Sequence, residues 1–144
     1  MTLEEKKQQL IDELSIIEDP HERLAYIIER ARDYPALDEE YKIDTFKIEG
    51  CQSALWLYPR FEQNQCRFQA DSDAVITKGI AGLLAELYDE ATPEEILAHP
   101  PDFLGEVGIT QHLTPNRRNG LTNLWQRIKG YAEHCLDGEA APRN

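Results

Sequence analysis

The first 44 residues show the hydrophobic spacing of two helices. One stripe of apolar residues at the helical period comprises Leu10, Ile11, Leu14 and Ile17. A second stripe comprises Leu24, Ala25, Ile27, Ile28 and Ala31. Asp19 and Pro20 suit the cap and the first turn of the second helix, and Pro35 follows its end. The pattern therefore predicts two helices followed by a polar loop.

The spacing changes from helical to alternating after residue 44. Phe46 and Ile48 alternate with polar neighbours, which predicts a half-buried strand. The apolar run 54–58 predicts a second strand that Pro59 ends, and the alternation over 65–70 predicts a third. Because the connections between these strands are short, we expect them to pair as an antiparallel meander.

The remainder of the chain is predicted to be helical. A run of capping side chains precedes a long helix and comprises Asp71, Ser72 and Asp73. Gly79 and Gly82 lie inside that helix, where glycine costs about 1 kcal/mol relative to alanine, and they indicate close approach of a neighbouring element. Residues 92–95 form a capping box for a short helix, and residues 114–115 open the last helix.

Together these elements predict an α+β fold in a single domain over residues 1–144, with a three-stranded antiparallel sheet and helices packed around it. We expect two N-terminal helices and a loop over 1–44 and the antiparallel strands over 45–71. A helical part follows over 72–136, and residues 137–144 are expected to form a frayed tail.

The chain carries 27 acidic and 15 basic residues, which give a formal charge of −12. Such a charge repels phosphate backbones and anionic lipid surfaces, so general binding to nucleic acid or to membranes is disfavoured. No apolar run approaches the roughly 18 residues of a membrane span, and the N-terminus lacks the layout of a secretory signal. We therefore expect a cytoplasmic protein.

The charged residues are unevenly distributed along the chain. Between Glu106 and Glu133 there is no acidic residue, and we call this stretch the acid-free window. Its basic residues are Arg117, Arg118, Arg127 and Lys129. Two interpretations stay open at this point: a solvated helix face, or a patch that faces an anion or a protein partner.

The three cysteines differ in their surroundings. Their spacing fits neither a zinc site nor a disulfide framework, so we expect free thiols and no metal. Cys66 shares the inward-facing positions of its strand and Cys135 continues the apolar stripe of the last helix, so both are predicted to be packed. Cys51 follows Gly50 among polar residues, which favours a thiol presented on a loop. Because no histidine lies nearby as a base, carriage of a group suits Cys51 better than hydrolysis.

Four ordered segments resemble the signature segments of the SufE family of cysteine desulfuration proteins. They cover residues 50–56, 68–79, 92–96 and 112–121, and the first reads Gly-Cys-Gln-Ser-Ala-Leu-Trp. The departures from the family pattern are Thr77, Ile80 and Asn116, where the family more often has valine, leucine and serine. None of these departures falls on the cysteine.

The resemblance implies a SufE/IscU-like fold and a sulfur acceptor that is not itself an enzyme. Proteins of this family take persulfide sulfur from a SufS-type cysteine desulfurase, stimulate that enzyme, and deliver sulfur for iron–sulfur cluster assembly on a SufBCD-type scaffold complex. The acceptor cysteine of the family falls on Cys51. Pyridoxal phosphate then belongs to the desulfurase, and this chain needs no cofactor of its own. A homodimer is a possible further assembly.

The resemblance also implies roles for residues around the acceptor. Gly50, Gln52 and Ser53 would shape the loop that carries the thiol. Asp73 reads as a helix cap from its context, and the resemblance adds a role in holding or releasing that loop. Arg117 matches the family's arginine after the Thr-Pro pair and lies in the acid-free window, so we expect it to face a partner or to position the loop.

Two other classes of function stay open on the sequence alone. An iron–sulfur scaffold would use the cysteines as cluster ligands, which requires Cys51, Cys66 and Cys135 to converge. Their predicted positions on a loop, in a strand and at a helix end argue against convergence. A redox or hydrolytic cysteine enzyme would need a resolving cysteine or a histidine partner, and the sequence shows neither at a recognisable spacing.

Overall fold

The computed structural model describes residues 1–50 and 52–138, so Cys51 and residues 139–144 of the predicted tail lie outside the described residues. The helices are α1 (Leu3–Ile16), α2 (Pro20–Arg30), α3 (Val75–Tyr88), α4 (Pro93–Ala98), α5 (Phe103–Glu106) and α6 (Pro115–Leu136). The strands are β1 (Leu55–Glu62) and β2 (Gln65–Ser72). None of the helices in this part of the chain is long and apolar enough to cross a membrane.

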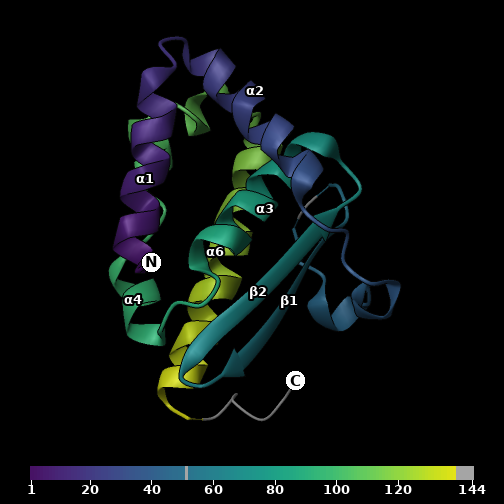
Figure 1. Ribbon diagram of the computed structural model, residues 1–144. Coiled ribbons are helices and arrows are strands. Elements are labelled where there is room, and N and C mark those ends of the chain that lie inside the picture. The colour runs from purple at the N-terminus through teal and green to yellow at the C-terminus, as the bar shows by residue number, and fades with distance from the viewer. Residues whose placement is uncertain (51, 139–144) are drawn as a thin grey trace.

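α3 is the central element of the fold, as Figure 1 shows. It contacts α1, α2, α6 and both strands, and α1 lies on the side of α3 that is away from the sheet. The consecutive residues from Gly79 to Ala85 are all buried, so this helix is covered around its circumference rather than along one stripe. The result is an α+β fold in which a small antiparallel sheet packs against one side of the helices.

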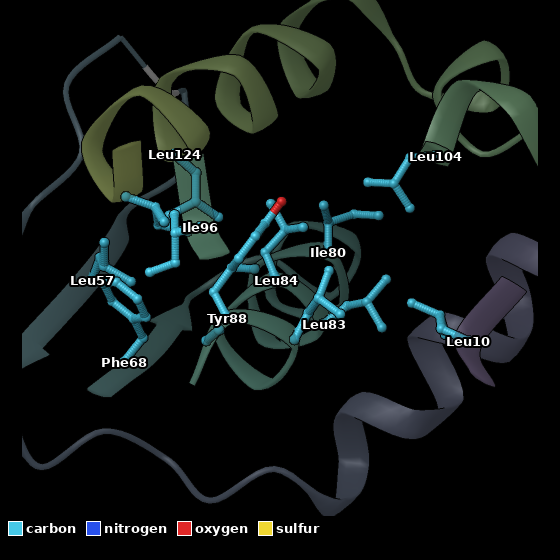
Figure 2. Packing of buried hydrophobic residues seen from close by; sticks show 14 of the residues in the cluster. Leu10, Leu57, Phe68, Ile80, Leu83, Leu84, Tyr88, Ile96, Leu104 and Leu124 are labelled. Carbon is cyan, nitrogen blue, oxygen red and sulfur yellow. The ribbon is translucent and has the colours of Figure 1, made fainter. Parts of the chain in front are cut away.

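Side chains from each layer meet around α3 (Figure 2). Leu83, Leu84 and Tyr88 of α3 are buried among apolar residues of the other elements. The surrounding residues include Leu10 of α1, Leu57 of β1, Phe68 of β2, Ile96 of α4, Leu104 of α5 and Leu124 of α6. The Tyr88 hydroxyl donates to the His99 carbonyl at 2.6 Å, so the polar atom of this buried ring has a partner.

Gly79 and Gly82 mark two close approaches to α3, which confirms the prediction made from their positions. A Cβ on Gly79 would lie 3.2 Å from Cα of Ile28 in α2. A Cβ on Gly82 would overlap the ring of Tyr34, in the turn that follows α2. The absence of a side chain at these two positions therefore lets α2 and the turn after it pack tightly onto the centre of the fold.

The sheet has two strands, β1 and β2, rather than the predicted three. The predicted first strand is wrong, because residues 44–46 form a 3₁₀ turn and Lys47 makes only an isolated antiparallel bridge with Trp56. The Ile48 N–H still donates to the Leu55 carbonyl at 2.8 Å, so this segment lies beside β1 without extending the ladder. The opposite edge of residues 45–49 does not pair with a further strand. It binds side chains of α6, as described below.

Pro59 lies inside β1 and does not end a strand, contrary to the prediction. Backbone groups of alternate strand residues point to the same edge, and the Leu55 carbonyl points away from β2 toward Ile48. Pro59, which lies four residues after Leu55, therefore has its backbone nitrogen on the outer edge of the sheet. No hydrogen bond of the β1–β2 ladder is lost there, which is the condition under which a strand tolerates proline.

Two glycines in helices should respond in opposite ways to alanine. A Cβ on Gly130, inside α6, would meet no described atom within 4 Å. Gly130→Ala should raise the free energy of unfolding by about 0.5–1 kcal/mol, because alanine has less backbone freedom in the unfolded chain. Gly82→Ala should lower it by about 1–3 kcal/mol, because the added methyl group overlaps Tyr34. Urea unfolding followed by circular dichroism measures both, and an unchanged Gly82→Ala variant would contradict this packing.

Candidate functional site

The chain that precedes the predicted acceptor, Cys51, is held by α6. Gly50 adopts a φ of +82°, in the left-handed region that favours glycine. A Cβ on Gly50 would lie 2.5 Å from Nδ2 of Asn123 in α6. The same Nδ2 donates to the Glu49 carbonyl at 3.0 Å. The backbone angle therefore favours glycine at residue 50, and a side chain there would displace Asn123.

The chain that follows Cys51 is anchored at Ala54 by the end of β2. The Ala54 N–H donates to Oδ1 of Asp73 at 3.1 Å, and the Asp73 N–H donates to the Ala54 carbonyl at 3.3 Å. The Ser72 hydroxyl donates to the same carbonyl at 2.6 Å. The prediction that Asp73 caps α3 is wrong, because the cap is Ala74, which makes no side-chain capping bond. The Asp73 carboxylate binds the distant Ala54 amide instead.

A cavity of about 230 Å³ lies between residues 52–55, α3 and the start of α6. Its polar lining comprises Gln52, Ser53, Thr77, Thr114, Asn116 and Arg117. Its apolar lining includes Leu55, Ile76, Ile80, Leu121 and Leu124. A concave site that combines apolar walls with a few polar groups is suited to holding a small group in a defined orientation.

The structure brings the predicted site residues to one end of the molecule. Gln52, Ser53 and Arg117 line the same cavity, while Gly50 and Asp73 hold the chain on either side of the acceptor position. Arg117 occupies the first turn of α6, where its N–H donates to the capping hydroxyl at 3.3 Å. Their proximity accords with the roles that the sequence predicts for them, and those roles stay predictions.

Asp71 joins three parts of the structure next to this site, and it is not a helix cap as predicted. Its side chain is buried and accepts hydrogen bonds from the N–H groups of Leu37 at 3.0 Å and Ser72 at 2.8 Å. The ammonium groups of Lys42 and Lys78 lie 3.4 and 3.5 Å from its oxygens. Burial raises the pKa of Asp71, but the hydrogen bonds and the two lysines outweigh it, so the pKa lies below its usual range.

Part of the acid-free window has a structural use. Arg118 donates to the Leu113 carbonyl at 2.6 Å. Arg127 donates to the carbonyls of Lys47 at 2.9 Å and Thr45 at 3.4 Å. The window is therefore neither a plain solvated helix face nor wholly a partner-facing patch, since two of its arginines bind the backbone of this chain. Its first arginine lines the cavity.

Cys66 and Cys135 are buried free thiols, which confirms the prediction that both are packed. They interact with each other between β2 and the end of α6, and burial raises the pKa of both. Neither is a source of thiolate near neutral pH. Within residues 1–50 and 52–138, no group of three histidine, cysteine, aspartate or glutamate side chains is arranged to hold a metal ion.

Asn123 and Arg127 belong to this site but were not identified from the sequence. Their partners are backbone carbonyls that lie 74 and 80 or more residues away along the chain, so no local pattern reveals the contacts. The available signal was the acid-free window, which contains both positions. It pointed to this part of the chain without indicating that the partner is backbone.

Comparison with known proteins gives a consistent set of matches. The family model described as "SufE: Fe-S metabolism associated domain" matches residues 8–132. SufE-like protein 1, chloroplastic/mitochondrial, of Arabidopsis thaliana is 32% identical over 130 residues, which cover 90% of this chain and 35% of that protein. The chain therefore spans about a third of the plant relative.

Two bacterial relatives match over most of their own length. An uncharacterized SufE-like protein of Rhizobium meliloti is 29% identical over 133 residues, covering 89% of this chain and 95% of that protein. An uncharacterized SufE-like protein of Synechocystis is 30% identical over 128 residues, covering 89% of this chain and 80% of that protein. Among solved structures, a hypothetical protein from Thermus thermophilus has a TM-score of 0.76 at 24% identity, covering 95% of this chain and 99% of that one. The similarity to the Thermus thermophilus structure shows that the two chains share a fold.

We predict that Asp71→Asn destabilises the protein and does so in a pH-dependent way. Asparagine keeps one acceptor oxygen but loses the charge that faces Lys42 and Lys78, so the free energy of unfolding at neutral pH should fall by about 1–3 kcal/mol. Because the folded pKa of Asp71 is lowered, its ionised form stabilises the fold above the unfolded pKa of about 3.9. This stabilisation is lost as the pH falls through the lower, folded pKa.

Urea unfolding as a function of pH measures the difference between the wild type and Asp71→Asn. The difference should be constant at neutral pH and should shrink below about pH 4. Asp33→Asn is the matched control, since Asp33 is exposed and its replacement should change stability by less than about 0.5 kcal/mol. A difference that does not vary with pH would contradict the ionised state assigned to Asp71.

Proposed function

Because this chain belongs to the SufE family, a family associated with Fe–S metabolism, we propose that it accepts persulfide sulfur on Cys51 from a SufS-type cysteine desulfurase. By removing the sulfur it stimulates the desulfurase, and it delivers that sulfur for iron–sulfur cluster assembly on a SufBCD-type scaffold complex. The protein is an accessory carrier in this scheme. Pyridoxal phosphate and the cleavage of the carbon–sulfur bond of cysteine belong to the desulfurase.

The proposed reaction is an exchange between a thiolate and a persulfide. The Cys51 thiolate attacks the outer sulfur of the desulfurase persulfide, a new sulfur–sulfur bond forms at Cys51, and the bond to the donor cysteine breaks. The donor sulfur leaves as a thiolate with the electron pair of that bond. One persulfide and one thiolate give one persulfide and one thiolate, so no external oxidant or reductant is required.

The observation that supports this proposal most is the way the chain is held around residue 51. Glu49 and Gly50 are fixed against α6, and Ala54 is fixed by Ser72 and Asp73 at the end of β2. These contacts fix where the chain enters and leaves a short connection, and a connection anchored at both ends suits a group that must meet a partner's persulfide.

Arg117 supplies positive charge beside this connection, because it lines the cavity together with Gln52 and Ser53. A cationic side chain favours the thiolate form of a nearby cysteine and also the anionic form of a persulfide. It provides an attractive site for an acidic partner surface as well. We assign Arg117 both roles within the proposal, with Gln52 and Ser53 shaping the connection.

The remaining cysteines do not favour the alternative of an iron–sulfur scaffold. Cluster ligands are thiolates, whereas burial raises the pKa of Cys66 and Cys135 and disfavours their ionised form. Both thiols are also enclosed in the hydrophobic core, where a cluster would displace packed side chains. A carrier with one reacting thiol accounts for these environments better than a scaffold with three.

Mass spectrometry should locate the accepted sulfur. After incubation with a cysteine desulfurase, L-cysteine and pyridoxal phosphate, we expect an added sulfur atom on Cys51 and none on Cys66 or Cys135. Omission of L-cysteine is the control for sulfur carried over during purification. Cys51→Ser should abolish both the modification and the stimulation of the desulfurase while the circular dichroism spectrum stays unchanged. An unmodified Cys51, or full stimulation by Cys51→Ser, would overturn the proposal.

Replacement of Arg117 should weaken productive encounter with the desulfurase. Arg117→Gln should raise the concentration of this protein that gives half-maximal stimulation by about fivefold, because a cationic contact beside the acceptor is lost. Lys129→Gln removes the same charge from the same helix but not from the cavity, and should change the value by less than about twofold.

Salt provides a second measure of the same contact. The difference between wild type and Arg117→Gln should decrease as salt is raised from about 0.05 to about 0.5 M, because exposed charges are screened over shorter distances. Equal effects of Arg117→Gln and Lys129→Gln at all salt concentrations would show that overall charge, and not the position of Arg117, controls the encounter.

A further inference from the structure

Two side chains of α6 hold the segment that precedes the acceptor position. Asn123 donates to the Glu49 carbonyl at 3.0 Å. Arg127 donates to the Lys47 carbonyl at 2.9 Å and to the Thr45 carbonyl at 3.4 Å. We call these two side chains together with the three carbonyls the α6 ladder. Both side chains are half-buried, and of the three bonds the one from Arg127 to the Lys47 carbonyl is partly buried.

The α6 ladder follows from the match between two backbone repeats. Residues four apart on an α-helix are about 6 Å apart along its axis, and residues two apart on an extended chain are about 6.6 Å apart. Asn123 and Arg127 are four residues apart, and Glu49 and Lys47 are two apart. Successive turns of α6 therefore meet alternate carbonyls of a segment that runs in the opposite direction.

The other edge of the same segment faces β1, where the Ile48 N–H donates to the Leu55 carbonyl at 2.8 Å. Residues 45–49 are thus bound on one edge by a strand and on the other by side chains of a helix. The position of Glu49, two residues before Cys51, consequently depends on Asn123. Burial of Ile48 in the core adds the remaining contact of this segment.

We propose that Asn123 and Arg127 are positioning residues for sulfur transfer, which act through the backbone of residues 45–50 to set where the chain enters residue 51. The inference rests on the proposed function and adds that side chains of α6 set the position of the chain before Cys51. Attack on a persulfide requires the attacking sulfur to align with the bond that breaks, so a loosened chain lowers the rate of transfer more than it weakens docking.

The hydrogen bond from Asn123 to Glu49 also depends on the absence of a side chain at Gly50. A Cβ there would lie 2.5 Å from Nδ2 of Asn123, so a larger residue would push Asn123 away from the Glu49 carbonyl. The effects of Gly50→Ala and Asn123→Ala should therefore be non-additive, because each removes the same hydrogen bond. The double variant should transfer sulfur at nearly the rate of Gly50→Ala alone.

Hydrogen exchange tests the α6 ladder in the isolated protein. Asn123→Ala and Arg127→Gln should each speed exchange of the Ile48 N–H by about tenfold, because a lost hydrogen bond lowers the free energy of local opening. The amides of β2 should be unaffected. Gln126→Ala is the matched control, since Gln126 is an exposed residue of the same helix. Unchanged exchange at Ile48 would overturn the holding role of the ladder.

Transfer kinetics test the consequence for function. At saturating concentrations, Asn123→Ala and Arg127→Gln should slow sulfur transfer to Cys51 by about tenfold, while the dissociation constant for the desulfurase stays within about twofold. Arg127→Lys, which keeps a cationic donor, should recover part of the rate. A general loss of stability would instead lower the melting temperature, and it would not slow transfer selectively while leaving the dissociation constant unchanged.

The possible failures are distinguishable. If wild-type Cys51 acquires no sulfur, the proposed function is wrong and the positioning role fails with it. If the wild type acquires sulfur and the variants do so at an undiminished maximal rate, the positioning role alone is wrong. Weaker docking with an unchanged maximal rate would likewise overturn it, because α6 would then act as a binding surface.

Discussion

Burial of α3 on all sides is the constraint on which the rest of the structure depends. The stretch of α3 from Gly79 to Ala85 has no polar side chain and is buried throughout, and a sheet of two strands is too small to cover it. α1, α2 and α6 therefore pack around it, and Gly79 and Gly82 admit Ile28 of α2 and the ring of Tyr34. The candidate site forms where three of these elements meet, at the start of α3, the end of β2 and the first turns of α6.

A two-stranded sheet leaves backbone groups on both of its edges, and neighbouring backbone segments and a polar side chain complete part of the hydrogen bonding there. On the outer edge of β2, the Asp89 carboxylate accepts from the Phe68 N–H at 3.0 Å. Beside β1, the segment 45–49 occupies part of the edge and is itself completed by Asn123 and Arg127. The segment that precedes residue 51 is therefore bound on one edge by a backbone hydrogen bond to β1 and on the other by side chains of α6.

The features that could be predicted from the sequence are those decided within a few residues. Helical stripes and the capping box at residues 92–95 depend on near neighbours, and both are present. The glycines of α3 indicated a close approach without indicating that the partners are Ile28 and Tyr34. The errors concern side chains whose partners are distant. Asp73 has the local pattern of a helix cap, yet it binds the amide of Ala54, and alternation at Phe46 and Ile48 cannot show that α6 replaces a strand. Pro59 was misjudged because strand edges are a tertiary property.

The distribution of charge bears on how an acidic protein can sustain a reactive thiolate. A net charge of −12 opposes ionisation of any thiol through the mean potential of the molecule. The acid-free window removes that opposition locally, since α6 directs its N-terminal turn and Arg117 to the cavity beside residues 52 and 53. The buried Cys66 and Cys135 lack such an environment, and burial holds them in the thiol form. In the proposed function, two properties therefore distinguish Cys51 from the other cysteines. In this scheme a partner reaches its thiol, and a cationic side chain lies near its neighbours in the sequence.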